Sequence, residues 1–183
     1  MNREEALKLV KENVSKENLI KHMLAVEAIM KGVAEYLEED KEKWDLVGLL
    51  HDVDFGRTEN DPEKHALLAE DILKDKVDEE IIRAIKSHNF EHTKVNPESK
   101  MEYTLIAADA ISGLIIAAAL IVPSKKLADV KVKSIKKKFK QKDFARNCNR
   151  ENILYCEKID IPREKFFEIS LKALQSISDD LGL

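Results

Sequence analysis

Apolar residues recur every three or four positions along most of the chain, and no segment shows sustained alternation of apolar and polar residues. The first pattern is typical of helices that bury one face, whereas alternation would indicate strands. Leu19, Met23, Val26, Met30 and Val33 illustrate it, because this spacing places all five side chains on one side of a helix. The sequence therefore predicts an all-α fold.

Turn and cap signals divide the chain into about eight helices. Asn2 and Glu5 have the spacing of a capping box, and Ser15 is expected to cap a long helix. Asp61, Pro62 and Glu63 have the composition of a helix start, with a cap residue, a proline and an acid in order. A loop is expected over residues 52–60. The predicted helices are a short one after Asn2, then residues 15–38, 42–51, 61–74, 78–88, 99–122 and 150–158, and a last one after Pro162.

One domain is expected over residues 1–183, because chains divide into separate cores only beyond ~250 residues. Its core should comprise residues 15–122, with residues 123–183 packed on it as a basic segment and C-terminal helices. The first residues carry charges throughout and lack the apolar segment of a signal peptide, so a cytoplasmic protein is expected. Cys148 and Cys156 are too few for a disulfide framework.

The longest apolar run, residues 107–122, is expected to be a buried core helix. It contains Asp109 and Ser112 and is shorter than the ~20 residues that cross a bilayer. No membrane partner is therefore expected.

Charge is distributed unevenly. The net charge is −4, but residues 125–150 hold eleven Lys or Arg against two Asp, a local balance of +9, which leaves −13 for the remainder. Most of these lysines are expected to form a solvated helix face. The alternative for the segment is attraction of an anionic substrate. Nucleic acid is not an expected partner, because no aromatic residues are interleaved with the lysines to stack on bases.

Four of the five histidines fall on the apolar faces of four different predicted helices. A single histidine in such a place is more often a hydrogen-bonded core residue than a ligand. Four that point inward from four helices are harder to satisfy separately. They are His22, His51, His65 and His88.

Two aspartates join these histidines. Asp52 follows His51 at a helix end, and Asp109 interrupts the most apolar helix of the chain, where an unpaired carboxylate costs several kcal/mol. Asp109 could pair with a buried histidine or lysine, but one divalent cation would satisfy two carboxylates and several imidazoles together. Imidazole and carboxylate ligands suit manganese, iron, nickel, cobalt or zinc. The residues thus favour a transition-metal site.

The chain resembles the HD superfamily, which is named for an adjacent His-Asp pair. The family pattern is a histidine, the pair and a later aspartate, each on a different helix, and His22, His51, Asp52 and Asp109 match it in order. The pair is commonly followed by Ile-Gly, whereas Val53 follows it here. Residues 109–114 and 144–146 are also similar to bacterial HD proteins of comparable length and unassigned substrate.

The resemblance implies an all-α metal-dependent hydrolase that cleaves phosphate esters with a metal-activated water. His22, His51, Asp52 and Asp109 would be the core ligands, and Asp52 would bridge the ions if two bind. His65 and His88 stand where members with two ions place further histidines, and they would hold the second ion or contact the phosphate.

The expected substrate is a small, anionic, phosphorylated molecule such as a nucleotide. Arg146 and Arg150 are the predicted phosphate-binding residues, because the planar guanidinium fork suits phosphate better than lysine does. Two alternatives stay open. Some two-iron HD proteins share this ligand set and are oxygenases, and a third possibility is a regulatory module without catalysis. The sequence does not specify an oligomeric state.

Overall fold

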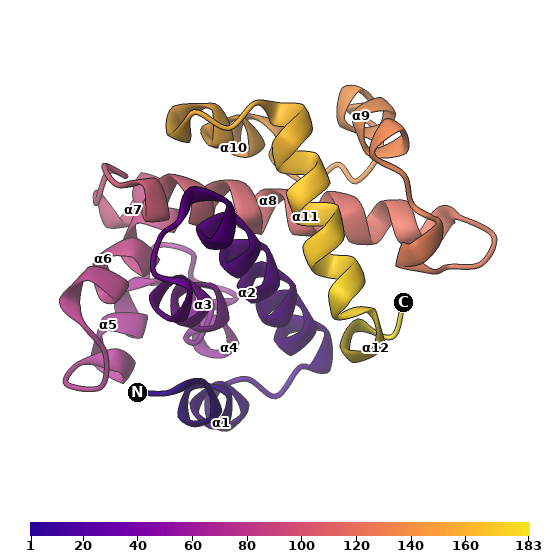
Figure 1. Cartoon of the computed structure of the whole chain (residues 1–183). Coiled ribbons are helices and arrows are strands. Elements are labelled where there is room, and N and C mark those ends of the chain that lie inside the picture. The colour runs from indigo at the N-terminus through magenta and orange to yellow at the C-terminus, as the bar shows by residue number, and fades with distance from the viewer.

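The most apolar segment of the chain forms the central helix of the fold, α8 (Lys100–Ile121). Ser99 begins it with a capping box, in which its hydroxyl accepts from the Glu102 amide while the Glu102 carboxylate accepts from the Ser99 amide. Fourteen of its 22 residues are buried, and they cover most of the helix surface. Such a widely apolar helix needs neighbours on most of its sides, and helices that precede and follow it in the chain pack against α8 (Figure 1).

The computed structural model describes all 183 residues and contains no strand, so the all-α prediction is confirmed. Eight α-helices have seven or more residues, and four further helices are single turns. The helices are α1 (Arg3–Asn13), α2 (Glu17–Leu37), α3 (Lys41–Leu50), α4 (Phe55–Thr58), α5 (Leu67–Leu73), α6 (Glu79–His88), α7 (Phe90–Thr93), α8, α9 (Val132–Lys140), α10 (Arg150–Ile153), α11 (Arg163–Ser176) and α12 (Ser178–Leu181), with 3₁₀ turns at Leu127–Asp129 and Leu154–Ile159. Of these, α2, α3, α6, α9, α10 and α11 pack against α8. Seven of the eight long helices were predicted, whereas α9 was not, and the predicted helix over residues 150–158 is the single turn α10 followed by a 3₁₀ turn.

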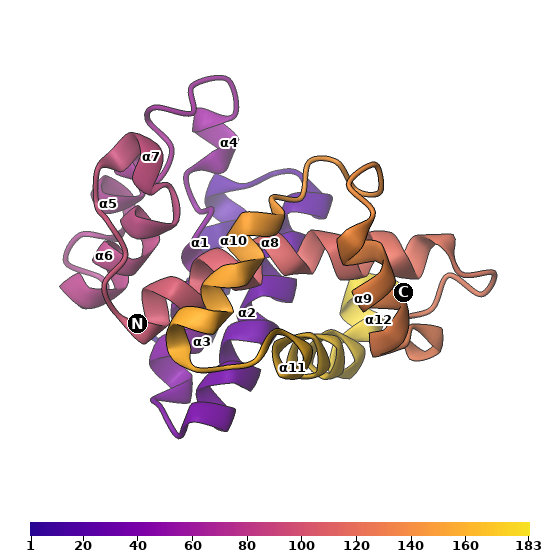
Figure 2. The ribbon, with the colours of Figure 1, turned by 90° about the horizontal axis from the view of Figure 1, so that it is seen from above.

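One hydrophobic cluster of 44 buried residues runs through the molecule, from Ala6 near one end of the chain to Leu181 near the other. Burial on this scale is the dominant favourable term in folding. Two views show α5, α6 and α7 gathered at one end of the bundle and α9 and α12 at the other, with α2 and α8 between them (Figures 1 and 2). The chain therefore forms one domain around one core.

Two predicted helix starts are wrong. The long helix is capped by Lys16 instead of Ser15, because the Lys16 carbonyl is the first to accept intrahelical bonds, from the amides of Leu19 and Ile20. Residues 62–66 form turns, and α5 begins only at Leu67, because Ala66 has a left-handed backbone with φ of 68° that interrupts the helix.

Two segments expected as loops each contain one helical turn, α4 and α7. In α4 the Thr58 hydroxyl donates to the Asp54 carbonyl, which stabilises the turn. Propensity patterns do not detect helices this short, because a single turn adds one or two hydrogen bonds and no periodic face.

By length and composition α8 could cross a membrane, and it is the one helix that meets this test. α8 begins before the apolar run of residues 107–122, because its first turns also include polar residues that the run leaves out. In its most apolar window, 61% of the residues are buried against the rest of the protein. Packing within the fold thus accounts for its composition.

The basic segment contains α9, whose Ile135 is buried while most of its lysines are exposed. Lys136 pairs with Glu164 on α11 at 2.8 Å, and the ammonium group of Lys138 lies 4.5 Å from the centre of the Phe144 ring. Most lysines of the run therefore form a solvated face, as the sequence predicted.

Gly48 allows α2 and α3 to pack closely. A β-carbon at Gly48 would lie 2.6 Å from the Glu27 Cα and 2.8 Å from the Glu27 amide nitrogen, which are backbone atoms that cannot turn aside. We expect Gly48→Ala to lower the free energy of unfolding by about 1–3 kcal/mol, because α2 and α3 must separate. Urea denaturation measures this effect.

Gly32, on α2, provides the matched control. A β-carbon there would make ordinary contacts at 3.4–3.5 Å, so Gly32→Ala should leave stability unchanged or raise it by up to about 1 kcal/mol through helix propensity. Equal effects of the two substitutions would contradict the close-packing explanation.

Candidate metal centre

The four inward histidines and both aspartates meet at one place between the helices. His22 lies on α2, His51 follows the last residue of α3, and His88 is the last residue of α6. His65 lies in the turns before α5, and Asp109 lies near the middle of α8. Asp52, which follows His51, completes the set. The structure therefore brings together all six residues that the sequence singled out.

His22 and His51 face each other through their Nε2 atoms, which are 3.2 Å apart. His51 Nδ1 lies 2.8 Å from the Gly48 carbonyl oxygen, which can only accept, so Nδ1 carries the proton. The Ser112 hydroxyl donates to the Asp109 carbonyl, so its oxygen accepts from His22 Nδ1 at 3.3 Å. In the neutral form, both Nε2 atoms therefore present lone pairs.

His65 and His88 repeat this arrangement, with their Nε2 atoms 3.0 Å apart. His88 Nδ1 donates to the Ile85 carbonyl. His65 Nδ1 lies 3.0 Å from Oδ1 of Asp54, whose carboxylate accepts. These two Nε2 atoms are thus also directed toward each other as acceptors.

Two facing acceptors cannot form a hydrogen bond and need a positive charge between them. Each imidazole has its Nδ1 proton fixed by a carbonyl, a hydroxyl or a carboxylate, which is how metal-binding histidines are oriented in proteins. The pairs need either an extra proton or a cation.

Asp52 lies between the two histidine pairs. Its Oδ1 is 3.5 Å from His51 Nε2, 3.3 Å from His65 Nε2 and 3.6 Å from His88 Nε2. Its Oδ2 is 3.7 Å from His22 Nε2. These distances are too long for hydrogen bonds between Asp52 and all four rings at once. A metal ion between the carboxylate and the imidazoles would account for them.

Two sets of donor atoms satisfy the spacing of a metal site, and they share Asp52. One set is His22, His51 and Asp52, and the other is Asp52, His65 and His88. Asp109 adds a carboxylate to the first set, with Oδ1 3.1 Å from His22 Nε2. The donor set of imidazole nitrogens and carboxylate oxygens fits a divalent transition metal.

The pKa values of His65 and His51 are shifted in opposite directions. Burial works to lower the pKa of His65, but its hydrogen bonds to Asp52 and Asp54 raise that pKa to about 9. Burial lowers the pKa of His51 to about 4, which keeps this ring in its neutral, ligating form. The carboxylates around His65 thus stabilise a charge at a position that a metal ion would also occupy.

Asp54 fixes the position of His65, although from the sequence alone it could not be distinguished from surface charges. It is fully buried, and its Oδ2 accepts from the amides of Ala66 and Ala69 at 2.8 and 3.1 Å. The N-terminus of α5 is therefore capped by a side chain from another segment. The same carboxylate holds the left-handed Ala66 and orients the imidazole beside it.

The sequence matches the HD domain family over residues 19–114, a stretch that contains every donor described above. The chain belongs to the HD domain family. This membership implies the superfamily of metal-dependent phosphohydrolases, whose domains bind divalent metals. No curated protein and no solved structure matches the chain.

In this HD domain three clefts reach the donors, and two of them are lined by both His22 and Asp109. One of these two, of about 390 Å³, is also lined by His65 and His88, and the larger cleft, of about 580 Å³, extends toward α10. The third, of about 550 Å³, lies between Lys16, His22 and Phe55. About a third of the Asp109 side chain is exposed. All three volumes fall in the range of small-molecule sites.

The two arginines predicted to bind phosphate differ in position. Arg146 lines the larger cleft, is exposed and makes no ion pair or side-chain hydrogen bond. The Arg150 guanidinium instead donates to the carbonyls of Gln141, Phe144, Ala145 and Cys148. This arrangement does not support Arg150 as a phosphate-binding residue, because main-chain carbonyls engage its terminal nitrogens.

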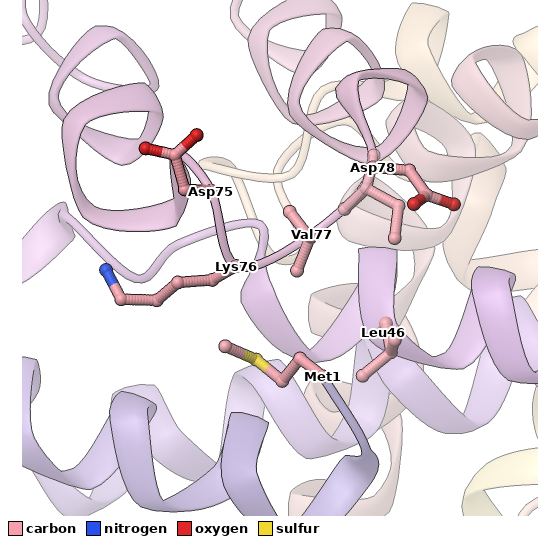
Figure 3. A pocket seen from close by; sticks show the side chains of 7 residues that line it. Met1, Leu46, Asp75, Lys76, Val77 and Asp78 are labelled. Carbon is pink, nitrogen blue, oxygen red and sulfur yellow. The ribbon is translucent and has the colours of Figure 1, made fainter.

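Other charged residues near the donors have structural partners. Glu27, which is buried, accepts two hydrogen bonds from Arg3 at 2.6 and 2.8 Å. Arg57 donates to the Asn13 side chain. A separate hollow of about 340 Å³ beside α3, where Met1, Leu46 and Val77 lie close together (Figure 3), has no histidine in its lining and offers no comparable ligand set.

We expect Asp54→Asn to weaken metal binding by about 10–100-fold, because the amide loses the charge that orients His65 and supports the positive centre. Competition titration with a metal-sensitive dye measures the affinity. Asp71→Asn, which changes an exposed aspartate of α5, is the control and should bind metal like the unchanged protein. If the two variants behave alike, Asp54 has no such role.

Proposed function

We propose that this HD domain is a phosphohydrolase that binds two divalent transition-metal ions and cleaves a small phosphate ester. The observation that carries the proposal is the pair of facing Nε2 lone pairs on each side of Asp52. His22, His51, Asp52 and Asp109 would hold one ion, and Asp52, His65 and His88 the other.

When bound, such ions lower the pKa of a coordinated water and neutralise charge on phosphoryl oxygens. The chain supplies a fixed frame for this chemistry. His51 and Asp52 are almost entirely buried, so their positions are set by packing. Asp52 contributes the shared carboxylate, which is also the catalytic role predicted for it.

Arg146 would bind the substrate phosphate. It is the one Lys or Arg that lines the two clefts containing both His22 and Asp109. Its guanidinium has no partner within the chain, so it can pair with an anion at little cost. Lys16 lines the third cleft, but it is paired with Glu59. The remaining Lys and Arg side chains line none of the three clefts.

The decisive experiment is a screen of phosphorylated metabolites and nucleotides against protein loaded with manganese, cobalt, nickel, zinc or iron, with release of inorganic phosphate as the readout. Running the iron-loaded screen with and without dioxygen separates hydrolysis from oxygenation. Phosphate release without dioxygen supports the proposal. Turnover that requires dioxygen, or none with any metal, favours the oxygenase or the regulatory alternative.

His65→Asn and His88→Asn test the number of ions. Each should lower the metal content by about one equivalent per chain and remove most phosphate release, because the second donor set loses an imidazole. Elemental analysis measures the stoichiometry. His92→Asn, at the exposed fifth histidine, is the control. Full metal content and full activity in both variants would contradict a two-ion site.

Arg146→Ala should raise KM for a phosphorylated substrate by about five- to tenfold without changing the melting temperature, because a free guanidinium is lost. Arg150→Ala should lower the free energy of unfolding by about 1–3 kcal/mol, because backbone carbonyls lose their donors. Steady-state kinetics and thermal unfolding together measure both effects. A raised KM in Arg150→Ala together with lower stability in Arg146→Ala would instead support Arg150 as the phosphate-binding residue.

A further inference from the structure

Gly113 is an exposed glycine in the interior of α8, and no contact within the chain explains it. A β-carbon built there would meet no atom within 4 Å. Glycine in a helix interior costs about 0.5–1 kcal/mol relative to alanine. At Gly48 the cost is explained by the Glu27 backbone 2.6 Å away, whereas at Gly113 the neighbouring space is open.

That open space belongs to the larger cleft beside the metal donors. Gly113 lines the cleft together with His22 and Asp109, and it lies one helical turn beyond Asp109. Side chains of a helix lean toward its N-terminus, so a longer side chain at position 113 would extend toward Asp109. The glycine therefore leaves this cleft wide beside Asp109, along the surface of α8, while the cleft lined by His65 and His88 also reaches the donors.

The opposite wall of this cleft is the loop of residues 141–149, whose position is fixed by hydrogen bonds to its backbone carbonyls. Arg150 donates to carbonyls of the loop, and the Cys148 thiol donates to the Ala110 carbonyl of α8 at 2.8 Å. The side chains of Asn147 and Asn152 line the cleft and form no hydrogen bond within the chain. Fixed walls with free amide groups are typical of a site that recognises a polar ligand.

We propose that Gly113, Asn147 and Asn152 form the subsite for the organic part of the phosphate ester, next to the phosphate-binding Arg146, and that Gly113 sets its width. This inference rests on the proposed function. The free amides offer donors and acceptors to hydroxyl groups, and no Phe, Tyr or Trp lines this cleft to stack on a base. The ligand chemistry that fits is therefore a hydroxyl-rich, sugar-like group.

The test compares three probes on manganese-loaded protein by titration calorimetry: inorganic phosphate, methyl phosphate and ribose 5-phosphate. The unchanged protein should bind ribose 5-phosphate more tightly than methyl phosphate. Gly113→Leu should weaken ribose 5-phosphate binding by about tenfold or more and so remove this preference, because leucine fills the subsite. Binding of inorganic phosphate and methyl phosphate, and the metal content, should not change.

The same variant reports on folding. Gly113→Leu should raise the melting temperature by about 2–4 °C, because leucine favours the helix and contacts nothing. Gly32→Ala, at the other helix-interior position described above, should leave all three affinities unchanged. Weaker sugar-phosphate binding in a more stable protein cannot be attributed to misfolding.

Two results would overturn the inference while leaving the proposed function standing. They are phosphate binding with no preference for ribose 5-phosphate in the unchanged protein, and a preference that survives in Gly113→Leu. Absence of inorganic phosphate binding to the metal-loaded unchanged protein would instead overturn the proposed function itself. The two failures are thus distinguishable.

Discussion

Four imidazole nitrogens converge on the buried carboxylate of Asp52, and all four present lone pairs in the neutral form. In a low-dielectric interior such a group is costly unless a positive charge lies within it. The surrounding hydrogen bonds hold the four rings in this orientation, so the lone pairs stay directed toward one another. Backbone carbonyls, Ser112 and Asp54 each fix an Nδ1 proton, so no ring can rotate to offer a donor to its partner.

The fold places these groups by using several helices that the core holds at fixed separations. α8 crosses the centre and carries Asp109, while α2 and α3 pack closely at Gly48 and carry His22 and His51. α5 and α6 lie together at one end of the bundle and bring His65 and His88 to the other side of Asp52 (Figure 2). Ligands from separate helices make a bound ion a crosslink of the whole core.

Much of this could be predicted from the sequence, for identifiable reasons. Helical periodicity revealed the long elements, and histidines on apolar faces could be recognised because polar residues rarely occupy such positions without a partner. The cap of α5 could not be predicted, since it comes from Asp54, a residue outside that helix whose burial depends on tertiary packing. The roles of Arg146 and Arg150 could not be separated either, because both lie in one basic segment and only the folded loop shows which guanidinium meets carbonyls.

Arg150 holds its loop through main-chain oxygens alone, and a carbonyl is present whatever side chain a residue carries. Positions such as Gln141 and Ala145 can therefore change identity while the loop keeps the same path. The metal donors lie on other elements and are unaffected by such changes. A domain built in this way can change the lining of one cleft by mutation while the positions of its metal-binding side chains stay the same.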